Sequence, residues 1–179
     1  MRTLLIAATV AVATLSGVAY QHGQARPDGM HWREIAWPFP RDGWPAGRAF
    51  RCDVAGCGAG VELYVRPKIG FCNCDTGVAD DDEVDRVADL DLISARFAPL
   101  EAGNAVRLAD MTGRSRSYDL KMSDGSQHAA VGIALSHRCD LLVAVAQGSA
   151  TPSELQREAL AYLASGEIHR WMLASLGGR

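Results

Sequence analysis

The most constraining feature of this sequence is a series of alternating apolar and polar residues in its second half. A period of two places every second side chain on the same side of an extended strand. Segments with this alternation, separated by turn-forming residues, lie at 104–111, 114–122, 129–135 and 140–148. A single strand from 129 to 146 would be about 60 Å long, well beyond usual strand lengths, so "SHRCD" between them predicts a turn. The pattern therefore predicts an antiparallel meander.

Turn signals and shorter apolar segments complete the predicted sheet. Ser123-Asp124-Gly125 is typical of a hairpin, and Thr112-Gly113 predicts a second turn. "VELYVRP" (61–67) predicts a strand, with residues 69–74 as its partner or continuation. "LDLI" (90–93) continues the alternation and predicts one more short strand.

Two helix starts are marked by capping residues. Asp80 with Glu83 forms an Asp-x-x-Glu box, and the acids of this first turn favour the positive end of the helix dipole, so we assign them to capping rather than to cation binding. Thr151, Pro152 and Glu154 begin a C-terminal helical region that has a second apolar face over residues 168–176. The predicted fold class is α+β: an antiparallel sheet meander packed with C-terminal helices in a single domain, residues 51–179.

The N-terminus has the layout of a secretory signal peptide, residues 1–19. A positive start precedes the apolar run "LLIAATVAVATL", and the small residues Gly17 and Ala19 form a cleavage site. Cleavage after Ala25 and an uncleaved anchor helix are the alternatives. All but two of the 18 basic residues are arginine, which is typical of a GC-rich genome. The expected location is therefore the periplasm, or the exterior, of a bacterium.

Residues 20–50 form a tryptophan- and proline-rich segment, which we call the arm. Pro38, Pro40 and Pro45 exclude a regular helix or a central strand. We expect an extended structure whose aromatic side chains pack onto the domain, and the alternative is an aromatic surface for a ligand or partner. These aromatic residues are Trp32, Trp37, Phe39 and Trp44.

The five cysteines permit three interpretations. Four of them have the spacing C-x4-C-x14-C-x-C and are the candidate disulfide residues: Cys52, Cys57, Cys72 and Cys74. In an oxidising compartment we expect disulfides, preferably between the first and second pairs, although a local Cys52–Cys57 bond remains an alternative. The same four thiolates could instead hold zinc or copper, which would then be the cofactor. A redox centre is disfavoured because no Cys-x-x-Cys starts a helix.

Cys139 is the natural leftover cysteine because it is remote from the others, although a bridge from Cys139 to one of them is the alternative. With His137 it forms a weak candidate for a catalytic thiol and its base. Arg114 and Arg116 share one strand face and form a candidate anion site. The competing interpretation pairs these arginines with the Asp80–Asp82 acids or directs them into water.

No common catalytic, nucleotide-binding or haem-attachment motif is present, so an enzyme is disfavoured. The net charge of −3 and the lack of a basic stripe argue against nucleic-acid binding. We therefore expect an exported, disulfide-stabilised, non-enzymatic cell-envelope protein that binds a partner or a small ligand. Metal handling and a thiol-dependent enzyme are the alternatives, and membrane contact is expected only if the N-terminal segment stays uncleaved.

Overall fold

The computed structural model of the chain describes residues 31–40, 42–70 and 73–177. The expected signal peptide over 1–19, its alternative cleavage site after Ala25 and the alternative anchor helix all lie outside the described residues. Within the described ranges, no helix combines the length and the apolar composition needed to cross a bilayer.

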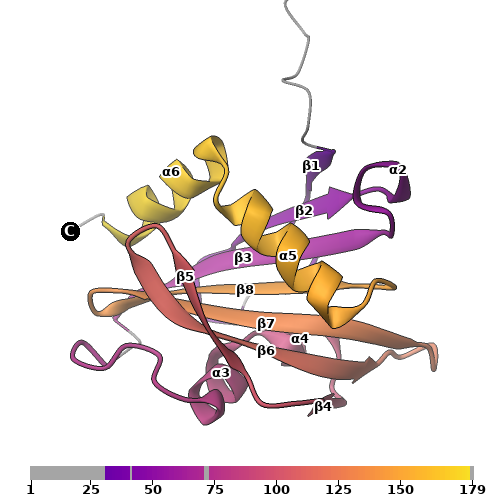
Figure 1. Cartoon of the computed structure of the whole chain (residues 1–179), viewed down its shortest axis with the longest axis horizontal. Helices are drawn as coiled ribbons and strands as arrows, with labels where there is room; N and C mark the ends of the chain where they lie inside the picture. Colours follow the sequence, from indigo (N-terminus) through magenta and orange to yellow (C-terminus); the bar gives the residue numbers. More distant parts are fainter. Residues whose placement is uncertain (1–30, 41, 71–72, 178–179) are drawn as a thin grey trace, which may run out of the picture. The chain divides into compact units, whose positions relative to one another are not determined.

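The described strands form one antiparallel sheet (Figure 1). Its order is β1-β2-β3-β8-β7-β6-β4, and β5 shares with β4 the outer edge of β6. The eight strands are β1 (Trp32–Ile35), β2 (Arg48–Cys52), β3 (Val61–Lys68), β4 (Phe97–Pro99), β5 (Asn104–Leu108), β6 (Met111–Lys121), β7 (Gln127–His137) and β8 (Asp140–Gly148). The meander is confirmed for β5 to β8, which pair in chain order.

Helices cover both faces of this sheet. The C-terminal helices α5 (Pro152–Leu163) and α6 (Gly166–Leu176) lie on one face, and α3 (Asp81–Val87) and α4 (Leu90–Ile93) lie on the other (Figure 1). A single turn, α2 (Val54–Cys57), joins β2 to β3. The predicted α+β class with C-terminal helices is therefore confirmed.

Strand alternation divides the apolar side chains between two cores. Leu63 and Ile133 face α5 and α6, where they pack with Leu155. Tyr118 and Val143 face the opposite way and pack with α3 and α4. Fully burying one such side chain stabilises the fold by about 1.5–3 kcal/mol relative to leaving it exposed. β7 and β8 contribute apolar side chains to both cores, and every residue of β8 except the first and the last is buried.

The predicted helix starts and two of the predicted turns agree with the structure. The Asp80 side chain accepts a hydrogen bond from the backbone N–H of Glu83, and Thr151 and Glu154 form a full capping box at α5. The β6–β7 hairpin turns between Lys121 and Gln127, around the predicted Ser-Asp-Gly sequence. The β7–β8 turn lies at residues 138–139, inside "SHRCD".

Three local predictions were wrong. "LDLI" forms the helix α4 rather than a strand. The turn expected at Thr112-Gly113 lies at residues 109–110, and Gly113 is inside β6, where a Cβ would lie 1.9 Å from the carbonyl oxygen of Ala134. In the described part of residues 69–74 no strand pairs with β3, whose partners are β2 and β8.

The arm contributes strands of its own. β1 forms one edge of the sheet by pairing with β2, so the sheet begins at Trp32 rather than at the expected domain start of 51. The connection between these two strands, residues 36–47, crosses β3 on the face that carries α3 and α4, where Trp37 and Phe39 contact Tyr64. This connection forms the site described next.

Candidate ligand site

The β1–β2 connection and β3 enclose a hollow of about 430 Å³, which we call the arm pocket. Its walls are mainly aromatic and proline side chains, with one carboxylate and one guanidinium among them. The principal lining residues are Trp37, Phe39, Pro40, Asp42, Trp44 and Arg66. A mostly apolar hollow with a few well-placed polar groups is the usual form of a small-molecule site.

Edge-to-face ring packing holds the aromatic wall in place. The Phe39 ring lies 5.2 Å from the Trp37 ring and 4.8 Å from the Tyr64 ring, measured between centroids. Such aromatic pairs contribute about 0.5–1.5 kcal/mol beyond the area they bury. At the end of the connection Gly47 leaves room for this packing, because a Cβ there would lie 2.6 Å from the Trp37 ring and 2.3 Å from the carbonyl oxygen of Val65.

At the floor of the arm pocket, Asp42 and Arg66 belong to a charge cluster that also contains Lys68 and Asp89, and of its four members all but Asp42 are buried. Arg66 is 3% exposed and binds two carboxylates at once. Its Nη1 and Nη2 donate to Asp42 at 2.9 and 2.6 Å, and its Nε and Nη2 donate to Asp89 at 2.5 and 2.6 Å. The Lys68 Nζ lies 2.8 Å from Asp89 and donates to the carbonyl oxygen of Val87 at 2.8 Å. Two cations and one buried anion, Asp89, therefore compensate each other inside the protein, and Asp42 adds a second anion at its surface.

Hydrogen bonds hold Arg66 and Asp42 in their charged forms. Burial opposes the charge of Arg66, but the hydrogen bonds to Asp89 and Asp42 outweigh it and raise its pKa. The hydrogen bonds from Arg66 lower the pKa of Asp42 from 3.8 to about 2. Both groups are therefore charged at neutral pH, which suits them to orient a ligand and not to transfer protons.

A second polar network lies on the same sheet face, beside a hollow of about 360 Å³. Glu62 accepts hydrogen bonds from Arg51, from the Tyr64 hydroxyl at 2.5 Å and from Gln147 at 3.1 Å. Burial opposes the charge of Glu62, yet the hydrogen bonds from Tyr64 and Arg51 lower its pKa. Because these donors already occupy both oxygens, the carboxylate stabilises the sheet surface and offers little to a ligand.

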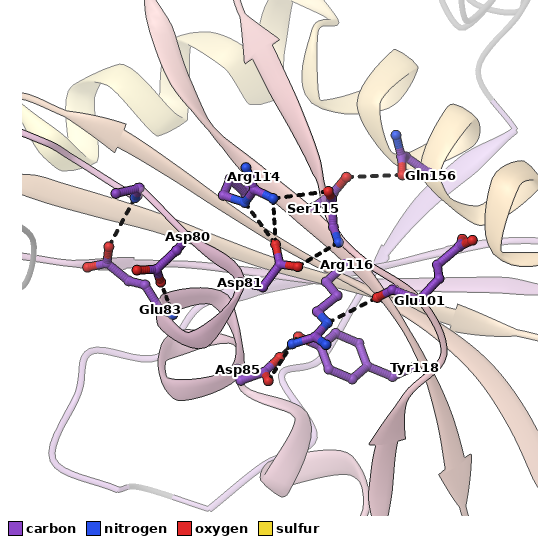
Figure 2. Close-up of polar contacts among 12 residues, drawn as sticks. Asp80, Asp81, Glu83, Asp85, Glu101, Arg114, Ser115, Arg116, Tyr118 and Gln156 are labelled. Atoms are coloured by element: carbon purple, nitrogen blue, oxygen red, sulfur yellow. Dashed lines mark hydrogen bonds and ion pairs between the residues drawn. The ribbon is translucent and has the colours of Figure 1, made fainter.

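Figure 2 shows that the candidate anion site formed by Arg114 and Arg116 is filled by carboxylates of α3. Arg114 donates to Asp81 at 2.6 Å, and Arg116 donates to Asp85 at 2.6 Å. The Tyr118 hydroxyl donates to the other Asp85 oxygen at 2.6 Å, and burial raises the pKa of Tyr118, with this hydrogen bond adding to the effect. Arg114 thus pairs with one of the Asp80–Asp82 acids, as the competing interpretation has it, whereas Arg116 pairs with Asp85, which that interpretation did not include; both guanidinium groups attach α3 to β6.

The described cysteines are all in disulfides, but the expected pairing was wrong. Cys52 bonds to Cys57, the local alternative, with Cα atoms 6.0 Å apart. Cys74 bonds to Cys139 across 65 residues, so Cys139 is not the leftover cysteine. Cys72, the remaining candidate, lies outside the described residues.

These bonds also bear on the metal and thiol hypotheses. Cys52, Cys57 and Cys74 have their sulfur atoms in disulfides, and the described residues contain no group of three or more side chains that could hold a metal ion. Cys139 has no thiolate to act as a nucleophile, and the His137 ring nitrogen Nδ1 lies 3.5 Å from an oxygen of Asp110. The structure therefore brings Cys139 together with Cys74 and not with a catalytic base.

The charged residues of the arm pocket were not recognised in the sequence. A signal was present, because alternate residues of β3 are Glu62, Tyr64, Arg66 and Lys68, a polar face within an otherwise apolar strand. Polar side chains on a face that is shielded from water need hydrogen-bond or ion-pair partners within the protein. The arm residues Trp37, Phe39 and Trp44 were recognised as an aromatic cluster that either packs or binds, and the structure places them in the pocket wall.

Comparison with known proteins gives no family. No family model matches the chain, and no curated protein matches it significantly. Among solved structures, a protein of unknown function from Pseudomonas aeruginosa, PA94, is similar over 78% of this chain and 81% of its own, with 14% sequence identity and a TM-score of 0.35. A likeness at this level carries no conclusion about function.

Proposed function

We propose that the chain is an exported, disulfide-stabilised binding protein of the bacterial cell envelope, and that it acts by holding a small ligand in the arm pocket without catalysing a reaction. The single observation that carries this proposal is the arm pocket itself, with three aromatic side chains above the buried guanidinium of Arg66. Two disulfides suit an oxidising compartment, and the secretory pattern of residues 1–19 supplies a route to it.

The chemistry of the pocket favours binding over catalysis. General acid–base catalysis works best with a group whose pKa is near the working pH. The pKa of Asp42 is instead lowered to about 2, away from a neutral working pH, and the guanidinium of Arg66 stays protonated. The pocket therefore supplies fixed charges and apolar surfaces, which are the elements of recognition.

The export part of the proposal is tested by producing the full chain with its own N-terminus in a bacterium and fractionating the cells. We expect a periplasmic product that begins at Tyr20, or after Ala25 if the alternative site is used, and that contains both disulfides. A cytoplasmic product with an intact N-terminus and reduced thiols contradicts export. Stoichiometric zinc or copper on reduced cysteines would establish metal handling in its place.

The binding part is tested by following the indole N–H signals of the tryptophans during titration with a library of small molecules. Trp37 and Trp44 line the pocket, whereas Trp32 and Trp171 pack against the opposite core and serve as internal controls. A ligand of the proposed site shifts the first pair and leaves the second unchanged. Ligands that shift only the control pair would place binding elsewhere and contradict the proposal.

A further inference from the structure

Resting on the proposed function, we propose that the arm pocket takes a neutral, polyhydroxylated ring, that is, a saccharide. Such a ring presents apolar C–H faces and a rim of hydroxyl groups that donate and accept hydrogen bonds. The walls, the charge balance and the remaining hydrogen-bonding capacity of the pocket each match one of these properties.

The walls provide flat apolar surfaces. Trp37, Phe39 and Trp44 supply rings, and Pro40 adds an apolar edge. The pocket volume of about 430 Å³ lies within the roughly 300–1,000 Å³ that small-molecule sites usually have. A ring with apolar faces can therefore pack against the tryptophans while its rim reaches the polar floor.

The charge balance disfavours a charged ligand. The four members of the cluster carry two positive and two negative charges, so they exert little net attraction on an ion. The tryptophan rings also have cations nearby already, with Arg66 Cζ 5.9 Å from the Trp37 centroid and Lys68 Nζ 5.8 Å from the Trp44 centroid. A quaternary ammonium ligand, which aromatic pockets otherwise favour, would enter beside these like charges.

The remaining hydrogen-bonding capacity suits hydroxyl groups. Arg66 has five N–H donors, and four of them serve Asp42 and Asp89 in the described structure, which leaves one on Nη1. Asp42 accepts three hydrogen bonds, two from Arg66 and one from the Trp44 backbone N–H at 3.2 Å, out of about four acceptor positions. A ligand hydroxyl group can therefore accept a hydrogen bond from the remaining Arg66 N–H and donate one to the remaining acceptor position of Asp42.

The test titrates the mature chain, with both disulfides intact, with maltotriose and with the trimer of N-acetylglucosamine as neutral probes. Glucuronate, glucosamine and choline are the charged probes, and the readout is the set of tryptophan indole N–H signals. We expect a neutral probe to shift the signals of Trp37 and Trp44 only. Trp44→Ala should weaken this binding about tenfold, and Trp171→Phe should leave it unchanged.

Folding of the variants is checked by the Trp32 signal, which reports on the opposite core. Asp42→Asn serves as a second variant, because it keeps the shape of the side chain while replacing one acceptor oxygen with a donor, and weaker sugar binding is expected. If a charged probe shifts the pocket signals and the neutral probes do not, the saccharide inference is overturned and the proposed function stands. If no probe and no library member shifts them, both are overturned.

Discussion

Replacing Asp89 with asparagine tests whether the charge cluster beneath the arm pocket is as buried as the structure places it. The Asp89 carboxylate is 11% exposed and compensates Arg66 and Lys68 together. The substitution keeps the size of the side chain but removes its charge, so that two buried cations lose a carboxylate that they share, while Asp42 still pairs with Arg66.

The expected loss follows from the asymmetry of buried ion pairs. Removing one partner of a buried pair destabilises a protein by about 3–5 kcal/mol, because the remaining charge stays desolvated. That is a large part of the roughly 5–15 kcal/mol by which folded domains are stable. With a urea dependence of about 2 kcal/mol per molar, the midpoint of unfolding should fall by about 1.5–2.5 M.

Equilibrium urea unfolding, followed by circular dichroism on wild type and Asp89→Asn, provides the measurement. Arg157→Gln is the matched control, because Arg157 is 65% exposed and its pair with Glu158 should contribute less than about 1 kcal/mol. A loss for Asp89→Asn no larger than that of the control would refute the reasoning, since it would show that water or rearrangement compensates the cations.

Three further predictions concern other parts of the molecule. Because the pKa of Asp42 falls from 3.8 to about 2 on folding, its contribution to stability is present above pH 3.8 and disappears as the pH falls toward 2. The melting temperature of the wild type should therefore fall over this pH range, and that of Asp42→Asn should depend less on pH. Replacing Cys74 and Cys139 by alanine should lower the free energy of unfolding by about 4 kcal/mol, against about 2 kcal/mol for Cys52 and Cys57, because the first pair closes the longer loop; equal losses would contradict this. Thr151→Ala should cost about 1 kcal/mol in urea unfolding through the lost α5 cap, and no measurable loss would mean that Glu154 holds this end without it.

Long alternating segments and capping residues made most of the fold predictable. Strands β6, β7 and β8 of the meander are long, and their periodicity separates one face from the other over many residues. Asp80 and Thr151 are informative because unpaired N–H groups at a helix start need an acceptor, whatever the rest of the fold does.

The predictions for short segments were wrong because the local sequence pattern does not determine the structure of so few residues. Four residues, as in "LDLI", fit a strand or a single helical turn equally well, and packing of Leu90 in the core beside α3 decides for the helix. The β5–β6 turn places Ala109 at φ 52°, a conformation that alanine rarely adopts, so its sequence carries no turn signal. Gly113 suggested a turn, yet this glycine lies inside β6, where it permits a close approach to the backbone of β7 at Ala134 and Leu135.

Pairings between distant residues could not be predicted without the strand order. Placing β8 beside β3 brings the segment after β3 to the β7–β8 turn, where the Gly70 N–H donates to the Asp140 side chain at 2.5 Å and Cys74 meets Cys139. The partners of Arg66 likewise come from the arm and from the start of α4, where Asp89 is the N-cap residue, and are separated from it by 24 and 23 residues. No local spacing rule connects such residues.

The β1–β2 hairpin has a consequence for how this protein can change. Its loop supplies every lining residue of the arm pocket except Arg66, while the strands on either side are held by their own ladders of backbone hydrogen bonds. Insertions, deletions or exchanges within residues 36–47 therefore change the walls of the pocket while strand register stays fixed. Evolution or a protein engineer can vary this loop and leave the sheet as it is, provided that the contacts of Asp42 with Arg66 and of Phe39 with Tyr64 are kept.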